Sequence, residues 1–146
     1  MLLTLPTVSL VLAGGLALLN TWLAVRVAQV RGREKVMVGD GGNERVIRRM
    51  RAHANFAENA PLLLALVLLI ELSLGTSTWL WAAAAMILVA RVLHPFGMDG
   101  WIPGRAIGTG ATFLLQVALG LWAIAIPLTF HAPRIAPAVE AMPARG

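Results

Sequence analysis

Four apolar stretches, each long enough or nearly long enough to cross a membrane as a helix, occupy most of this 146-residue chain. They run roughly over Leu5–Val25, Asn55–Leu74, Trp79–Leu93 and Ala106–Phe130. A helix needs about 20 residues to cross the hydrocarbon core of a bilayer, so the third stretch is short and depends on its flanks. The pattern therefore predicts an all-α membrane protein, folded as a bundle of four transmembrane helices, without a separate soluble domain.

The composition agrees with a single membrane domain. Charged residues make up only 13% of the chain, against about 25% in ordinary soluble domains. The first apolar stretch has no Lys or Arg before it and no small-residue cleavage site after it, so we expect a retained helix and not a signal peptide. Residues 1–130 are predicted to form the membrane domain, followed by a flexible Pro- and Ala-rich tail over residues 131–146.

Most cations of the chain lie between the first two spans. This connection holds Arg26, Arg31, Arg33, Lys35, Arg45, Arg48, Arg49 and Arg51. Under the positive-inside rule, the long basic loop between helices 1 and 2 is cytoplasmic, and both termini lie outside. The net charge of +5 then suits anionic lipid and not nucleic acid, because no aromatic residues are interleaved with the cations.

Thiol and metal chemistry supplied by the protein is not expected. The chain has no cysteine, which excludes a protein thiol nucleophile and a thiolate metal site. The histidines, His53, His94 and His131, have no spacing that fits a metal site.

A polar stripe begins where the second apolar stretch enters the membrane. Arg51, Asn55 and Glu58 are spaced i, i+4 and i+7, which places them on one face of a helix. Asn43, followed by Glu44 and a run of helix formers, predicts that this helix begins well before the bilayer. A cation, an amide and a carboxylate at this depth must satisfy one another between helices or bind a polar ligand.

A second polar cluster lies between the third and fourth apolar stretches. Arg91 and His94 are at i and i+3 near the cytoplasmic end of the third helix, which Pro95 is expected to bend or end. Pro103 and Gly104 are expected to open the fourth helix. A polar line then enters this helix through Arg105, Thr109, Thr112 and Gln116. Two arginine-rich lines that begin at the same membrane face suit a small ligand with anionic and amide groups.

The two clusters resemble the signature of a known family. The segments Arg51-Ala-His-x-Asn55-x-x-Glu58-x-x-Pro61, Arg91-x-x-His94 and Pro103-x-Arg105 are similar to those of the MAPEG family, the membrane-associated proteins in eicosanoid and glutathione metabolism. The similarity is to bacterial-type members that resemble microsomal glutathione transferases. It implies a homotrimer of four-helix subunits that binds glutathione as a co-substrate near the cytoplasmic membrane surface, between neighbouring subunits.

The resemblance also implies a role for particular residues. The positions that match glutathione-contacting residues of the family are Arg31, Arg51, Asn55, Glu58, Arg91 and His94. Arg105 matches the arginine that activates the glutathione thiol. The implied enzyme is a transferase or peroxidase of hydrophobic electrophiles or lipid hydroperoxides, in a bacterial inner membrane with its site on the cytoplasmic side. The chain has no tyrosine, and Ala106 stands where a relative has a serine, so Arg105 is the main candidate for thiol activation and eicosanoid specificity is disfavoured.

Three other interpretations fit parts of this sequence to different degrees. The polar stripe can act as a bond between helices, which contributes about 1 kcal/mol per hydrogen bond. A small four-helix exporter needs a carboxylate inside a span, and the first helix has no ionisable residue before Arg26, which disfavours that function. A non-catalytic membrane scaffold or binding protein that keeps the family fold is the main alternative to an enzyme.

Overall fold

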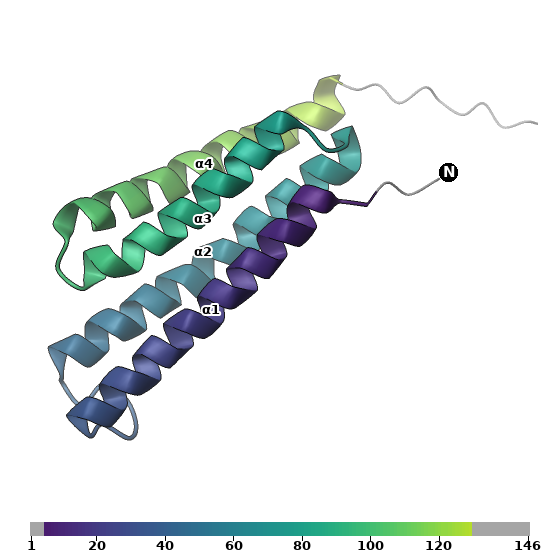
Figure 1. Ribbon diagram of the computed structural model, residues 1–146. Coiled ribbons are helices and arrows are strands. Elements are labelled where there is room, and N and C mark those ends of the chain that lie inside the picture. Colours follow the sequence, from purple (N-terminus) through teal and green to yellow (C-terminus); the bar gives the residue numbers. More distant parts are fainter. Residues whose placement is uncertain (1–4, 130–146) are drawn as a thin grey trace, which may run out of the picture.

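A computed structural model describes residues 5–129 of the chain, which form a bundle of four helices (Figure 1). The helices are α1 (Thr7–Glu34), α2 (Glu44–Leu74), α3 (Thr78–Met98) and α4 (Ile102–Thr129), and these described residues include no strand. Each helix is long and apolar enough to cross a membrane. The predicted all-α architecture with four spans is therefore confirmed, while the predicted tail over residues 131–146 lies outside the described residues.

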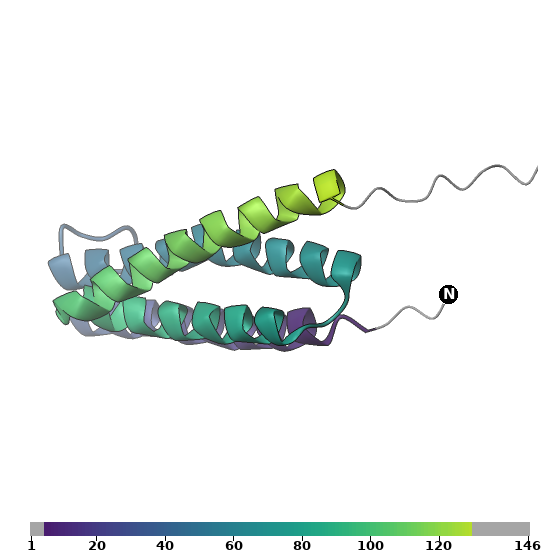
Figure 2. The same cartoon turned by 90° about the horizontal axis from the view of Figure 1, so that it is seen from above.

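The bundle consists of two helical hairpins. α1 lies beside α2, and α3 lies beside α4, as Figure 1 shows. In the view from above, α4 runs obliquely to α3 and diverges from it toward its yellow-green end (Figure 2). α2 and α3 each contact the three other helices, whereas α1 and α4 do not contact each other. Along α2, Leu63, Val67 and Ile70 recur with the period of a helix, so one face of α2 is buried. The core that they form also includes Leu12, Leu23, Leu80, Ile87 and Leu119 from the other helices.

The basic connection between the first two spans is mostly helical. Only residues 35–43 form a loop, and most of the cations lie on the extended ends of α1 and α2. The side chain of Asn43 accepts hydrogen bonds from the backbone N–H groups of Arg45 and Val46, at 3.0 and 3.3 Å. This is an N-cap, which confirms the expected early start of α2. The basic loop is shorter than the predicted connection between the first two spans because α1 continues to Glu34, past the predicted end of the first span at Val25.

Pro95 does not end α3, contrary to one of the two outcomes expected for it. The helix continues to Met98, and the N–H of Asp99 still bonds to the carbonyl of Pro95 at 3.1 Å. Proline removes one hydrogen bond from the preceding turn, but it can still accept one through its carbonyl. The additional turn is held by packing, since the buried Gly97 lies so close to the backbone of Arg105 that a Cβ atom there would collide with it.

The opposite end of the bundle is closed by the buried carboxylate of Glu71 on α2. α1 begins after Pro6, which supplies no side-chain cap. Glu71 accepts hydrogen bonds from the backbone N–H groups of Val8 and Ser9, at 3.0 and 2.8 Å. The hydroxyls of Ser9 and Thr76 also donate to it, at 2.6 and 2.7 Å. Because a helix leaves the N–H groups of its first turn free, Glu71 acts as a cap for α1 supplied by a neighbouring helix.

Candidate functional site

A cavity of about 590 Å³ lies between α2, α3 and α4 at the end of the bundle that carries the arginines. Its polar lining consists of Arg51, Asn55, His94, Arg105 and Thr109. Its apolar lining consists of Met98, Ile102, Ala106, Gly110 and Phe113. Residues predicted from two separate stretches of sequence therefore surround one space, in which the polar lining comes from all three helices and the apolar lining lies mostly on α4.

The polar wall is organised by contacts between helices. Arg51 is exposed, and Asn55 lies one turn further along α2, half-buried. The amide oxygen of Asn55 accepts a hydrogen bond from Nη1 of Arg91, at 3.1 Å. Across the cavity, Nδ1 of the buried His94 lies 3.2 Å from the hydroxyl of Thr109. The spacing of these residues along their helices thus brings them together. Hydrogen bonds between helices then fix the orientation of the side chains.

Arg91 is buried and does not line the cavity, although the family resemblance predicts that it contacts the ligand. Besides Asn55, its guanidinium donates to the hydroxyl of Thr112 and to the carbonyl of Gly108, the latter at 3.4 Å. α3 and α4 approach each other closely here because position 108 is glycine: a Cβ atom there would lie 2.9 Å from the carbonyl oxygen of Ala90. Arg91 therefore joins α2, α3 and α4 and orients Asn55, and its predicted direct contact with ligand stays a prediction.

Arg105 lies in the first turn of α4, where its side chain is exposed. It lines the cavity described above and a neighbouring one of about 580 Å³, which extends toward Arg48 and Glu44. No residue in the range 5–129 forms a hydrogen bond or an ion pair with its guanidinium. A guanidinium with all its donors available, at the edge of a cavity with an apolar wall, is suited to hold an anion.

Two of the predicted site residues lie away from this cavity within a single chain. Glu58 is exposed one turn beyond Asn55 and lines neither of the cavities beside Arg105. Arg31, on α1, donates instead to the sulfur of Met50, at 3.4 Å. Their predicted contacts with a ligand thus stay predictions, and one chain alone does not bring them to the others.

One turn further along α2 than Asn55, a second polar contact joins α2 to α4. The side chain of Asn59 donates to the carbonyl of Asn55, at 2.8 Å, and accepts from Nε2 of Gln116, at 2.9 Å. The sequence placed Gln116 on the polar line of α4 but gave no role to Asn59. The signal for such a role was an amide side chain next to Glu58 inside a predicted membrane span, because an amide inside the membrane needs a hydrogen-bond partner.

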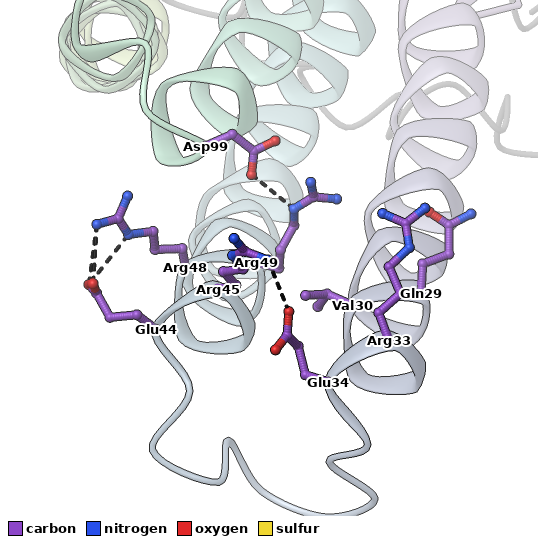
Figure 3. A pocket seen from close by; sticks show the side chains of 9 residues that line it. All are labelled: Gln29, Val30, Arg33, Glu34, Glu44, Arg45, Arg48, Arg49 and Asp99. Carbon is purple, nitrogen blue, oxygen red and sulfur yellow. Dashed lines mark hydrogen bonds and ion pairs between the residues drawn. The ribbon is translucent and has the colours of Figure 1, made fainter.

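A third cavity, of about 560 Å³, lies between the extended ends of α1 and α2 and beneath the α3–α4 turn (Figure 3). Its charged lining residues are Arg33, Glu34, Glu44, Arg45, Arg48, Arg49 and Asp99. Arg45 pairs with Glu34, Arg48 with Glu44 and Arg49 with Asp99, at 3.3, 3.2 and 2.9 Å. The charges of this cavity largely balance, so it attracts an anion less strongly than the cavity beside Arg105. Among residues 5–129, no cluster of side chains fits a metal ion.

The MAPEG family model matches residues 9–125 of the chain, from the first turn of α1 to near the end of α4. No curated protein and no solved structure matches the chain.

Proposed function

Because the chain belongs to the MAPEG family, we propose that it is a membrane-bound, glutathione-dependent transferase or peroxidase that acts on hydrophobic electrophiles. The observation that supports this proposal best is the cavity that the polar residues Arg51, Asn55 and Arg105 line together with the apolar Phe113. A polar, anionic thiol and a hydrophobic second substrate need those two kinds of lining next to each other.

The polar residues match the chemistry of glutathione, which has two carboxylates, one ammonium and two amides. Arg51 is proposed to hold a carboxylate through a forked pair of hydrogen bonds, and Asn55 to bond to an amide. Arg105 is proposed to lie beside the sulfur. A free thiol has a pKa of about 8.5, and a cation that lowers it by two units contributes about 2.7 kcal/mol and makes the thiolate the main form at neutral pH.

The apolar wall is proposed to bind the second substrate. Ile102, Gly110 and Phe113 lie on α4 beside or below Arg105, where a hydrophobic molecule can arrive from the bilayer. The thiolate sulfur would form a bond to an electrophilic carbon, and the leaving group would depart with the bonding electrons. With a hydroperoxide, the same thiolate would attack the terminal peroxide oxygen and break the O–O bond, which leaves the sulfenic acid of glutathione and an alkoxide that takes up a proton to become an alcohol. A second glutathione would then convert the sulfenic acid to glutathione disulfide and water.

The proposal includes a homotrimer with its sites on the cytoplasmic side of a bacterial inner membrane. The exposed carboxylate of Glu58 lies inside the predicted second span, and a charge that faces lipid at this depth is costly. A neighbouring subunit or a ligand that covers Glu58 removes that cost. The arginine-rich ends of α1 and α2 favour the cytoplasmic side. Light scattering of the detergent-solubilised protein tests the trimer, and a mass of one chain would exclude it.

Glutathione binding measured by calorimetry, together with turnover of a hydrophobic haloarene, tests the proposed activity. We expect Arg51→Ala to weaken glutathione binding tenfold or more, since a hydrogen bond to a charged group contributes about 1.5–3 kcal/mol. Arg45→Ala is the matched control, because Arg45 is an exposed arginine on the same helix and does not line the cavity. Absence of both binding and turnover in the unaltered protein would contradict the proposal and favour a non-catalytic scaffold.

A further inference from the structure

Arg51 and Arg105 belong to different helical hairpins, so their separation depends on how the hairpins are joined. Arg51 lies on α2, paired with α1, and Arg105 lies on α4, paired with α3. α1 and α4 do not contact each other. The relative placement of the two arginines at this end of the bundle therefore depends on the direct packing of α2 against α4, on α3 and on the turn between α3 and α4.

Asp99 in that turn connects the two hairpins. It follows the last residue of α3, and its Oδ1 accepts a hydrogen bond from Nε of Arg49 on α2, at 2.9 Å. Its Oδ2 accepts from Nη2 of Arg26 on α1. Figure 3 shows the carboxylate of Asp99 reaching from the α3–α4 turn toward Arg49. One carboxylate thus ties the turn to both helices of the other hairpin.

Arg26 gives this connection a fixed point. Its side chain is buried, and its guanidinium lies over the ring of Trp22, 4.6 Å from the ring centroid. The centroid of the Phe96 ring, in the last turn of α3, lies 5.7 Å from the same guanidinium. A cation held by a carboxylate and two aromatic rings has little freedom to move. The ion pair to Asp99 is therefore anchored on α1 and not only on an exposed side chain.

The turn that carries Asp99 is coupled tightly to Arg105. Gly97 lies against the backbone of Arg105, with no room for a side chain. The N–H of Trp101 bonds to the carbonyl of Phe96 at 3.3 Å, and the N–H of Gly104 bonds to the carbonyl of Trp101 at 2.9 Å. Gly104 in turn packs against the Trp101 ring. A displacement of the turn at Asp99 is thus transmitted to the first turn of α4.

We propose that Asp99 is a positioning residue for Arg105, and that its ion pairs with Arg26 and Arg49 fix the backbone at the start of α4 where the Arg105 guanidinium can reach the glutathione sulfur. This inference rests on the proposed function. The attraction between a cation and a thiolate falls with distance. If the separation grows from about 4 Å to about 6 Å at an effective dielectric constant of about 20, the thiol pKa rises by about one unit, which is a tenfold change in the thiolate equilibrium.

The test is a pH titration of the thiolate absorbance of bound glutathione at saturating concentration. We expect Asp99→Asn to raise the pKa of the bound thiol by about one unit. The affinity measured at pH 5.5, where the thiol is protonated, should stay within about twofold, since Arg51 and Asn55 are untouched. Glu34→Gln is the control, because it removes an exposed ion pair with Arg45 at the same end of the bundle without contacting Asp99.

The outcomes separate this inference from the proposed function. A thiolate in the unaltered protein whose pKa is the same in folded Asp99→Asn would overturn the positioning role alone. Absence of any thiolate in the unaltered protein would overturn both. If Asp99→Asn does not fold, Arg49→Gln removes only one of the two ion pairs, and we expect a smaller rise of the thiol pKa in the same direction. No rise in that variant would also overturn the role.

Discussion

Replacing Glu71 with Gln tests whether a carboxylate on α2 caps the start of α1. The change keeps the size of the side chain but removes its charge and turns one acceptor oxygen into a donor. In the folded protein, that side chain faces the backbone N–H groups of Val8 and Ser9 and the hydroxyls of Ser9 and Thr76. The N–H₂ group of Gln would then face other hydrogen-bond donors at the buried start of α1.

The expected loss follows from these contacts. Loss of an N-cap costs about 0.5–2 kcal/mol, and a hydrogen bond to a charged group contributes about 1.5–3 kcal/mol. Since one oxygen remains as an acceptor, we expect the free energy of unfolding to fall by about 2–4 kcal/mol in Glu71→Gln. Glutathione binding by the remaining folded protein should be unchanged, because Glu71 lies in the last turn of α2, far along the helix from the cavity residues Arg51 and Asn55.

Unfolding in mixed micelles, followed by far-ultraviolet circular dichroism as a denaturing detergent is added, measures this loss. Glu44→Gln is the control. It removes the charge of an exposed carboxylate on the same helix, which pairs with Arg48 at i, i+4. We expect the control to lose about 1 kcal/mol at most. If Glu71→Gln loses no more than the control, the capping role is refuted.

Three glycines give further predictions. Gly97→Ala should lower both the free energy of unfolding, by about 1–3 kcal/mol, and the thiolate fraction of bound glutathione, because the new Cβ displaces the backbone of Arg105; an unaltered thiolate spectrum would contradict this. Gly14→Ala, in open space on α1, should instead raise the free energy of unfolding by about 0.5–1 kcal/mol in the same assay. A decrease would show that another group packs against this position. Gly110→Leu should fill the apolar wall and raise the KM for bulky electrophiles more than for small ones, so an equal effect on both in steady-state assays would argue against that wall as their binding place.

The elements of the fold were largely predictable from the sequence. Long apolar stretches have few alternatives to membrane helices, and Asn43 is a strong N-cap signal that the structure confirms. The helix ends were less accurate. From sequence alone, proline at position 95 is expected to bend or end the helix, but the packing of Gly97 against Arg105 retains one more turn.

The candidate site was predictable to the extent that it depends on spacing along one helix. Arg51 and Asn55 lie one turn apart, and they line the same cavity as His94 and Arg105. Which polar groups pair across helices depends on the rotation and depth of each helix, and a local pattern does not contain that information. The sequence therefore gave no sign that Asp99 joins the two hairpins.

Buried polar residues showed the same limit. From sequence, Arg91 looked like its neighbour His94, a polar residue at a helix end. In the structure, Arg91 is enclosed by Asn55, Gly108 and Thr112, while His94 lines the cavity. A difference of less than one helical turn separates a residue that holds the bundle together from one that reaches the cavity.

The central claim is that Arg105 stabilises a glutathione thiolate in the cavity between α2, α3 and α4. An ultraviolet difference spectrum of the detergent-solubilised protein on addition of glutathione near neutral pH, compared with Arg105→Ala, tests it most directly. We predict a thiolate band in the unaltered protein that disappears in Arg105→Ala while glutathione still binds. Bound glutathione without a thiolate band, or a band of equal strength in Arg105→Ala, would contradict the claim.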